Sequence, residues 1–100
     1  MLDLSKVSVG DFSGYIGSPF NILLESGESF EAVLEEAEPH QKPSEHAAGL
    51  PRPEPFSLLF RIPDSVDLPQ RIYLLRHERL GEMALFLVPV GATLREAVFN

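Results

Sequence analysis

The sequence predicts an all-β protein, either a small six-stranded antiparallel barrel or a sandwich, with a short N-terminal helix. Residues 55–100 read almost continuously as strand, because apolar runs at 56–62, 72–75 and 83–90 are separated by compact turn signals. The chain has 100 residues, enough for one packed core. Its hydrophobic fraction of 44% and aromatic fraction of 9% are typical of a globular domain. We therefore expect residues 1–100 to form one β-domain.

The N-terminal part predicts a short helix and a first strand. Ser8 and Asp11 have the spacing of a capping box, in which each side chain accepts a hydrogen bond from the other residue's backbone amide. The apolar residues that follow share one stripe of a helix: Phe12, Tyr15 and Ile16. Nearby glycines limit this helix to a turn or two, and we expect it to close one end of the barrel or sandwich. Residues 20–24 form the first predicted strand.

The segment 29–38 fits both a helix and a strand. Four of its apolar residues keep helical spacing: Phe30, Val33, Leu34 and Ala37. The alternation of Phe30, Ala32 and Leu34 is the pattern of a strand. Three glutamates near the end of the segment would crowd the negative end of a helix dipole. We therefore predict a strand, with a helix as the alternative.

Four further strands are predicted at 56–62, 70–77, 83–90 and 93–99. Alternation groups several side chains on one face of their strand: Phe56, Leu58 and Phe60, then Arg71, Tyr73, Leu75 and His77, and finally Ala97 and Phe99. The strand at 83–90 is apolar on both faces, which predicts a central strand that is covered on both sides. Since Pro89 has no amide hydrogen, that strand must end there or lie at an edge.

Residues 39–54 are predicted to form a long exposed loop, because they hold four prolines and little apolar mass. His40 and His46 lie in this loop with glutamates nearby, but a flexible stretch of chain separates them and their spacing matches no standard zinc site. We expect no metal site and no cofactor.

The net charge of −7 lies entirely in the first half of the chain. Residues 1–50 hold nine acids and two lysines, whereas residues 51–100 hold six acids and six arginines. An acidic chain repels phosphate backbones, so we expect no nucleic-acid binding, and we expect the arginines on a solvated face. The absence of cysteine excludes disulfides. No signal-peptide pattern and no apolar run of the roughly 20 residues of a membrane span are present, which predicts a cytoplasmic protein without membrane contact.

The sequence contains no recognisable catalytic constellation. His77 can be combined with Ser57 and Asp64 into a triad, but no nucleophile-elbow glycines surround the serine. A histidine that caps a turn or pairs with a charge is the preferred interpretation. The residues with the types found at protein interfaces lie on one predicted strand: Arg71, Tyr73, Arg76 and His77. We predict that these four residues bind another protein, and the alternative for Tyr73 is a place in the core or at its rim.

A distinctive series of segments runs through the C-terminal half: PFSLLF at 55–60, LPQ at 68–70, LFLVPVG at 85–91 and EAVFN at 96–100. With these segments the chain resembles, over most of its length, a family of short bacterial proteins built around a domain of unknown function. The resemblance implies a compact β-domain and supports a strand at 29–38. It also implies a structural or accessory role beside phage-tail-like components, and it carries no catalytic residues.

Two functional hypotheses follow. The first is a non-enzymatic structural or accessory module that binds another protein or itself, for example through an exposed strand edge. The alternative is a small-ligand binding or catalytic barrel that uses His77, with the 39–54 loop as a lid. This alternative predicts a pocket lined by His77 and arginines.

Overall fold

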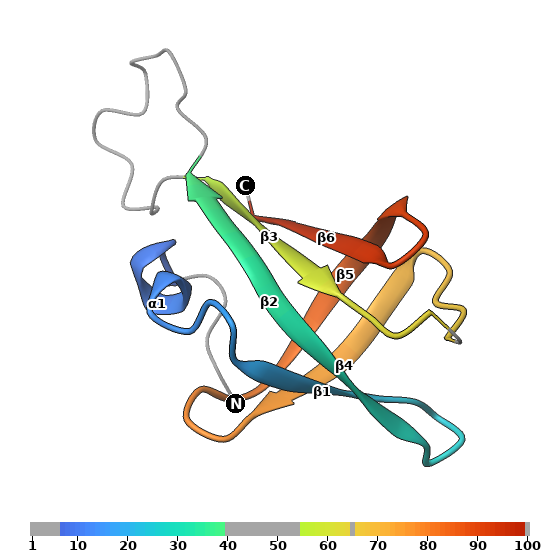
Figure 1. Ribbon diagram of the computed structural model, residues 1–100. Helices are drawn as coiled ribbons and strands as arrows, with labels where there is room; N and C mark the ends of the chain where they lie inside the picture. The colour runs from blue at the N-terminus through green and yellow to red at the C-terminus, as the bar shows by residue number, and fades with distance from the viewer. Residues whose placement is uncertain (1–6, 40–54, 65, 100) are drawn as a thin grey trace.

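Six strands form a closed antiparallel barrel in the computed structural model, which describes residues 7–39, 55–64 and 66–99 (Figure 1). The strands are β1 (Pro19–Leu23), β2 (Ser29–Pro39), β3 (Phe56–Arg61), β4 (Arg71–His77), β5 (Gly81–Gly91) and β6 (Leu94–Phe99). Their order around the barrel is β1-β2-β3-β6-β5-β4, and β4 pairs with β1 to close it. The predicted all-β fold is confirmed, and the structure selects the barrel over the sandwich.

The hairpin turns explain part of this topology. Gly27, between β1 and β2, and Gly81, where β5 begins, have φ angles of 96° and 83°. Side chains are strained in this left-handed region, so glycine is the residue that both turns require. The connection from β2 to β3 at 40–54 lies outside the described residues. Of the predicted 39–54 loop, the structure describes only Pro39, which ends β2.

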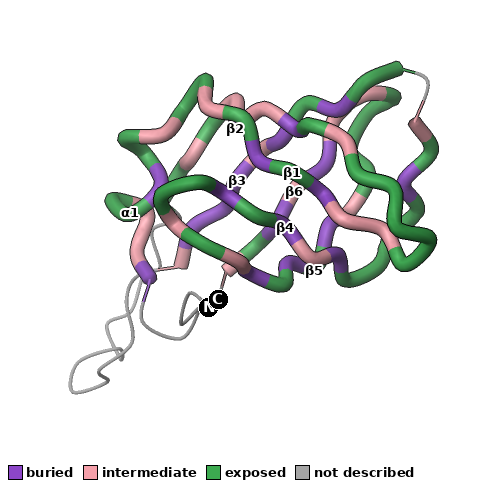
Figure 2. Tube along the Cα trace, turned by 90° about the horizontal axis from the view of Figure 1, so that it is seen from below, coloured by how far each residue is buried: buried purple, intermediate pink, exposed green. Residues whose placement is uncertain are grey.

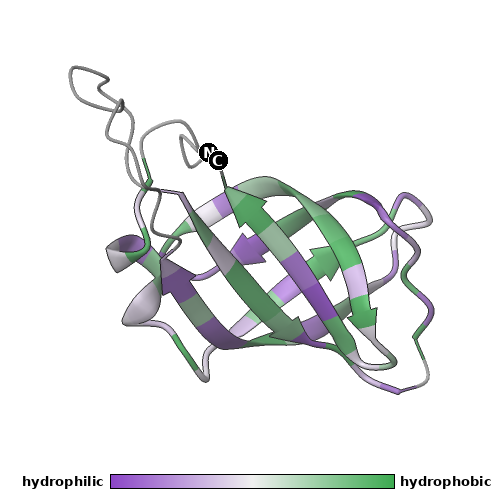
Figure 3. Cartoon of the chain, turned by 90° about the horizontal axis from the view of Figure 1, so that it is seen from above, coloured by the Kyte–Doolittle hydropathy of each residue, from purple (hydrophilic) through white to green (hydrophobic). Residues whose placement is uncertain are grey.

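Buried and more exposed residues alternate along the strands, and hydropathy alternates with burial on several strands (Figures 2 and 3). The residues that the sequence pattern grouped on one face of β3 and β4 are buried: Phe56, Leu58, Phe60, Tyr73, Leu75 and His77. Arg71, at the start of β4, is exposed. One face of each strand thus supplies the core of the barrel.

The outer face of β5 is not covered, contrary to the prediction for this strand. Met83, Leu85 and Leu87 point into the barrel and are at most 3% exposed, whereas Phe86 and Val90 are each 49% exposed. A single closed layer of strands has one interior, so alternate residues of β5 must face outward whatever their polarity. The apolar residues on that outer face are therefore a surface feature.

Two strands contain irregularities in their pairing. The register shifts between Leu34 and Glu36 in β2, and between Pro89 and Gly91 in β5. The segment 29–38 is confirmed as a strand, since it pairs with β1 on one side and β3 on the other. The expectation that β5 ends at Pro89 or lies at an edge there is confirmed in its second form, because β5 pairs with β4 only as far as Leu87 and Pro89 pairs with β6 alone. The strand itself continues through a register shift to Gly91.

The helix α1 (Gly10–Ser13) covers one end of the barrel (Figure 1). The ring of Phe12 is fully buried, and its centroid lies 5.8 Å from the ring centroids of both Phe56 and Phe99. The rings of Phe56 and Phe99 are stacked with their centroids 4.3 Å apart. The helix is thus tied to the start of β3 and to the end of β6 by aromatic packing.

Half of the predicted capping box forms. The Oδ2 atom of Asp11 accepts a hydrogen bond from the backbone amide of Ser8 at 2.9 Å, but the helix has no side-chain cap at its N-terminus. Ile16 also departs from the prediction, because it is 51% exposed while Phe12 is fully buried. The helix ends at Ser13, so Ile16 lies beyond it and does not share the stripe of Phe12.

Arg95 is buried, contrary to the expectation that the arginines lie on a solvated face. It is 5% exposed, and its guanidinium donates to the backbone carbonyls of Leu68, Gly91 and Leu94 at 2.8, 3.1 and 2.8 Å. A buried charge is tolerated when its hydrogen-bonding groups find partners. These bonds fasten the 62–70 connection to the β5–β6 turn, at the end of the barrel opposite α1.

Candidate functional site

His77 ends β4 and lies inside the barrel at the α1 end, where it is 3% exposed. Its Nε2 atom lies 2.8 Å from the Oγ atom of Ser18. Its Nδ1 atom accepts hydrogen bonds from the backbone amides of Arg79 and Leu80 at 3.0 and 3.2 Å. The imidazole therefore holds the β4–β5 turn with one nitrogen and the residue that precedes β1 with the other.

Burial lowers the pKa of the His77 imidazole, and the charges of the two residues that follow it act in opposite directions. Aromatic rings desolvate the imidazole: the centroids of Tyr15 and Phe20 lie 4.8 and 4.5 Å from its own. His77 is accordingly neutral in the folded protein at pH 7. Because Nδ1 accepts two amide hydrogens, the ring proton is assigned to Nε2, which donates it to Ser18.

This geometry suits a turn cap better than a catalytic base. In a serine hydrolase the histidine accepts the proton of the serine. Here His77 donates to Ser18, and its other nitrogen is occupied by backbone amides. Among the described residues, the hydrogen bonds of the ring do not reach Ser57 or Asp64, the other members of the hypothetical triad. The interpretation of His77 as a turn-capping residue is confirmed.

The structure separates the four predicted binding residues. Tyr73 and His77 lie inside the barrel and are 4% and 3% exposed. The Tyr73 hydroxyl donates to a backbone carbonyl of the preceding connection at 2.6 Å, and burial raises the pKa of this phenol. Arg71 and Arg76 are exposed, and the Nε atom of Arg76 donates to Glu82 across the β4–β5 ladder at 3.0 Å. Of the four residues, only the two arginines are therefore accessible to solvent.

An open groove of about 740 Å³ lies on the outer surface where β4 passes the end of β1. We call it the β4 groove, and the residues that line it are Leu23, Leu24, Glu25, Arg71, Ile72, Tyr73, Leu74, Ala84 and Phe86. The strand register explains how they meet. Leu23 pairs with Leu74, which pairs with Ala84 on its other side, and Ile72 pairs with Phe86. Cross-strand neighbours on one face lie close together, so these residues form two adjacent apolar rows.

The apolar rows of the β4 groove are accessible to solvent. Ile72 is 67% exposed and Phe86 is 49% exposed. Leu23 and Leu74 are half-buried, and Ala84 is exposed. Contiguous exposed apolar residues with a polar rim are typical of a contact surface.

A short sheet edge adjoins the groove. The ladder between β1 and β4 ends at the pair Leu23–Leu74, whereas the ladder between β4 and β5 continues to the pair Arg71–Leu87. Within the ladders of the described residues, the segment 71–73 is therefore paired on one side. A strand edge of this kind offers its backbone groups to a further strand.

The groove has a charge of each sign at its rim. Arg71 comes from β4, and Glu25 comes from the turn that follows β1. The groove therefore combines an apolar centre with a balanced pair of charges, which is the usual distribution at a protein interface.

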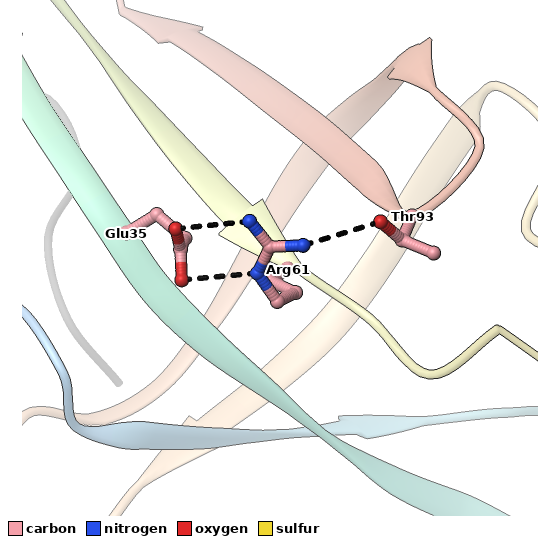
Figure 4. A network of polar contacts seen from close by, with 3 residues as sticks. All are labelled: Glu35, Arg61 and Thr93. Carbon is pink, nitrogen blue, oxygen red and sulfur yellow. Dashed lines mark hydrogen bonds and ion pairs between the residues drawn. The ribbon is translucent and has the colours of Figure 1, made fainter.

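A second charged cluster joins three segments outside the groove (Figure 4). The Nε and Nη2 atoms of Arg61 donate to the two carboxylate oxygens of Glu35 at 3.1 and 3.2 Å, and its Nη1 atom donates to the Thr93 hydroxyl at 3.4 Å. The hydrogen bond from Arg61 lowers the pKa of the Glu35 carboxyl, and the same bond raises the pKa of Arg61. This cluster links β2, β3 and the β5–β6 turn, and its role is structural.

Of the residues that line the groove, the sequence analysis proposed Arg71 and Tyr73 for binding and did not include the apolar rows. Ala84 and Phe86 were placed on a covered face because their strand is apolar on both sides. The length of the chain was a usable signal. Six short strands close into a single layer, and no second layer is then left to cover the outer face of that layer. Leu23 had no local signal, because its place beside Leu74 depends on a pairing between distant segments.

The described parts of the chain offer no group of three or more side chains placed to hold a metal ion. The two loop histidines, His40 and His46, lie outside those parts. In residues 7–39, 55–64 and 66–99, no helix has the length and apolar character that crossing a membrane requires.

The comparisons with known proteins identify a family. A family described as "Domain of unknown function (DUF6916)" matches residues 7–99. No curated protein matches the chain, and no solved structure matches it either. The family match spans α1, all six strands and the β4 groove, and it confirms the expected resemblance to a family built on a domain of unknown function. The chain belongs to the DUF6916 family.

Proposed function

We propose that this chain is a non-enzymatic structural or accessory module that binds another protein, or a further copy of itself, through the β4 groove. The observation that carries the proposal is the exposure of Ile72 and Phe86 side by side on the outer surface. Full burial of a side chain of this size contributes about 1.5–3 kcal/mol relative to full exposure, and Ile72 and Phe86 are 67% and 49% exposed. A partner that covers the groove therefore gains part of this free energy from each of the two residues.

The rim of the groove supports the same proposal. Aromatic, aliphatic and arginine side chains at the centre and edge of a patch are the types that dominate binding energy at protein interfaces. Phe86, Ile72 and Arg71 supply these types here. The family resemblance suggests a phage-tail-like assembly as the setting, in which a small barrel is held by its neighbours.

The alternative function, a small-ligand or catalytic barrel that uses His77, has less support. Both nitrogens of the imidazole are engaged, and Tyr15 and Phe20 fill the interior around it. His77 and Arg71 stand at opposite ends of β4, so a pocket that combines His77 with the groove arginine is not formed.

Affinity capture with matched surface variants tests the proposal. The wild type, Phe86→Glu and Val98→Glu serve as tagged baits in a lysate that also contains an untagged copy of the chain. Phe86 and Val98 are 49% and 50% exposed, so both substitutions place a carboxylate at a half-exposed outer position, and only Phe86 lies in the groove. Circular dichroism first checks that each bait is folded.

We expect specific proteins to be retained by the wild type and by Val98→Glu and to be lost from Phe86→Glu. Retention of the same proteins by all three baits would show that the groove is not the binding surface. Retention of nothing by any bait would count against a binding module.

A further inference from the structure

We infer that the β4 groove binds a second copy of this chain about a two-fold axis. The inference rests on the proposed function and names the partner. A two-fold interface brings the same patch of both subunits together, so the patch must complement itself in charge and in shape.

The charges of the groove meet this requirement. Arg71 and Glu25 line it from two different segments, one on β4 and one after β1. In a two-fold arrangement, Arg71 of each subunit faces Glu25 of the partner subunit, and the contact occurs twice. Opposite charges that meet across an interface fix its orientation and disfavour other arrangements.

The apolar part of the groove offers both an exposed side chain and a space that can receive one. Ile72 is the most exposed large apolar side chain of the described residues, at 67%, and it stands beside a groove of about 740 Å³. The protruding Ile72 of one subunit can therefore enter the groove of the other.

The distribution of net charge favours this face for contact between copies. Two acidic chains repel each other, but the net charge of −7 arises from residues 1–50, while residues 51–100 are neutral overall. Six of the nine residues that line the groove come from the neutral half, and Leu23, Leu24 and Glu25 are the exceptions. A contact through β4 and β5 therefore involves mainly residues of the half that carries no net charge.

Reciprocal charge reversal tests the inference. Arg71→Glu alone places two like-charged pairs in the dimer, and so does Glu25→Arg. We expect each variant to raise the dimer dissociation constant by about tenfold or more. In an equimolar mixture of the two variants, a mixed dimer holds two attractive pairs, one between the two native residues and one between the two substituted residues, so we expect the mixed dimer to form. The double variant also regains the dimer.

The mixture separates a contact between subunits from one within a chain. An ion pair between Arg71 and Glu25 of the same chain is restored by the double variant but not by mixing. Sedimentation equilibrium or light scattering after size exclusion gives the dissociation constants, and distinct mass tags identify the mixed dimer in native mass spectrometry.

A second pair of variants tests the apolar contact. Ile72→Glu is expected to leave a monomer at both low and high salt, whereas Val98→Glu is expected to leave the wild-type dimer. The wild-type dimer is expected to persist at high salt, because burial of apolar area is not screened and exposed ion pairs contribute little.

The inference and the proposed function fail in different ways. A wild type that stays monomeric at its highest soluble concentration overturns the second copy as partner. If the wild-type bait then captures a protein other than its own copy, and the Phe86→Glu bait does not, the proposed function holds. A dimer that Ile72→Glu and the charge reversals leave unchanged also overturns the inference, because the copies then meet elsewhere.

Discussion

The side chains of Ser18 and His77, 59 residues apart in the sequence, are joined by a 2.8 Å hydrogen bond inside the barrel. Ser18 precedes β1 and His77 ends β4, so the bond lies where these two strands close the barrel. The same imidazole accepts the amides of Arg79 and Leu80 in the next turn. One neutral side chain therefore holds both the closure of the barrel and a hairpin.

The first prediction is a loss of stability in mild acid. Folding lowers the pKa of His77 below its ordinary value of 6.5, so the unfolded chain binds this proton more readily than the folded one. The contribution of the neutral His77 side chain to the unfolding free energy is therefore complete well above pH 6.5. It is lost as the pH falls through 6.5 toward the lower folded-state pKa. Urea unfolding at about pH 8 and about pH 5.5 measures the difference in unfolding free energy.

His77→Asn is the control for this prediction. An asparagine side-chain oxygen accepts amide hydrogens in turns but does not titrate. The variant is expected to lose less stability than the wild type between the two pH values. Equal losses in both proteins would assign the acid sensitivity to other groups.

The second prediction concerns the buried guanidinium of Arg95. Arg95→Met removes its bonds to three backbone carbonyls and leaves those groups without this donor. We expect the unfolding free energy to fall by at least about 1.5–3 kcal/mol, the usual range for one hydrogen bond to a charged group. We expect the unfolding free energy of Arg95→Lys to lie between those of the wild type and Arg95→Met. Lysine keeps the charge, but its ammonium lacks the planar fork of donors.

The exposed Arg79 provides the matched comparison for Arg95. Arg79→Met removes the same functional group from the surface of a turn and is expected to change the unfolding free energy by less than about 0.5 kcal/mol. Chemical denaturation of the three variants under one set of conditions gives the comparison. Similar losses for Arg79→Met and Arg95→Met would contradict the structural role of Arg95.

The sequence predicted the strands well because strand formation depends on local alternation. In β3 the alternation of Phe56, Leu58 and Phe60 with less buried residues is enough to assign the inner face. The segment 29–38 was harder, because its spacing also fits a helix. Its pairing with two neighbouring strands is a tertiary property that settles the choice.

The features that escaped prediction depend on contacts between distant segments. Arg95 reads as a surface residue until the connection at 62–70 brings the Leu68 carbonyl to it. The β4 groove depends on the register that sets Leu23 beside Leu74. Likewise, the pattern predicted a turn cap at His77, but the role of Ser18 follows from barrel closure alone.

The third prediction concerns the aromatic plug at the α1 end. Phe99 stacks on Phe56 and contacts Phe12, but it is only partly buried. Phe99→Ala is therefore expected to cost about 2–3 kcal/mol, below the roughly 3–5 kcal/mol of a fully buried phenylalanine. Val98→Ala, at a position that is 50% exposed, should cost less than about 0.5 kcal/mol. Thermal or urea unfolding measures both changes in unfolding free energy. Equal losses at Phe99 and Val98 would mean that the packing of Phe99 on Phe56 and Phe12 adds no stability.

The fourth prediction contrasts the two glycines that bound β5. Gly81 has a φ angle of 83°, and a side chain there would meet no other atom within 4 Å, so the cost of Gly81→Ala comes from the backbone alone. We expect Gly81→Ala to lower the unfolding free energy by about 1–2 kcal/mol. Gly81→Asn is expected to lower it by less, since asparagine tolerates this left-handed region better. Gly91 does not have a positive φ angle, and a Cβ atom there would make ordinary contact with Leu94 at 3.5 Å.

Gly91→Ala is therefore expected to be neutral or to stabilise the protein by up to about 1 kcal/mol, because alanine restricts the unfolded chain. The two alanine substitutions are thus expected to change the unfolding free energy differently at the two ends of one strand. This difference separates backbone strain from any general effect of adding a methyl group. Urea unfolding of the three variants measures them. A loss at Gly91 as large as that at Gly81 would mean that the register shift after Pro89 requires glycine as much as the left-handed turn does.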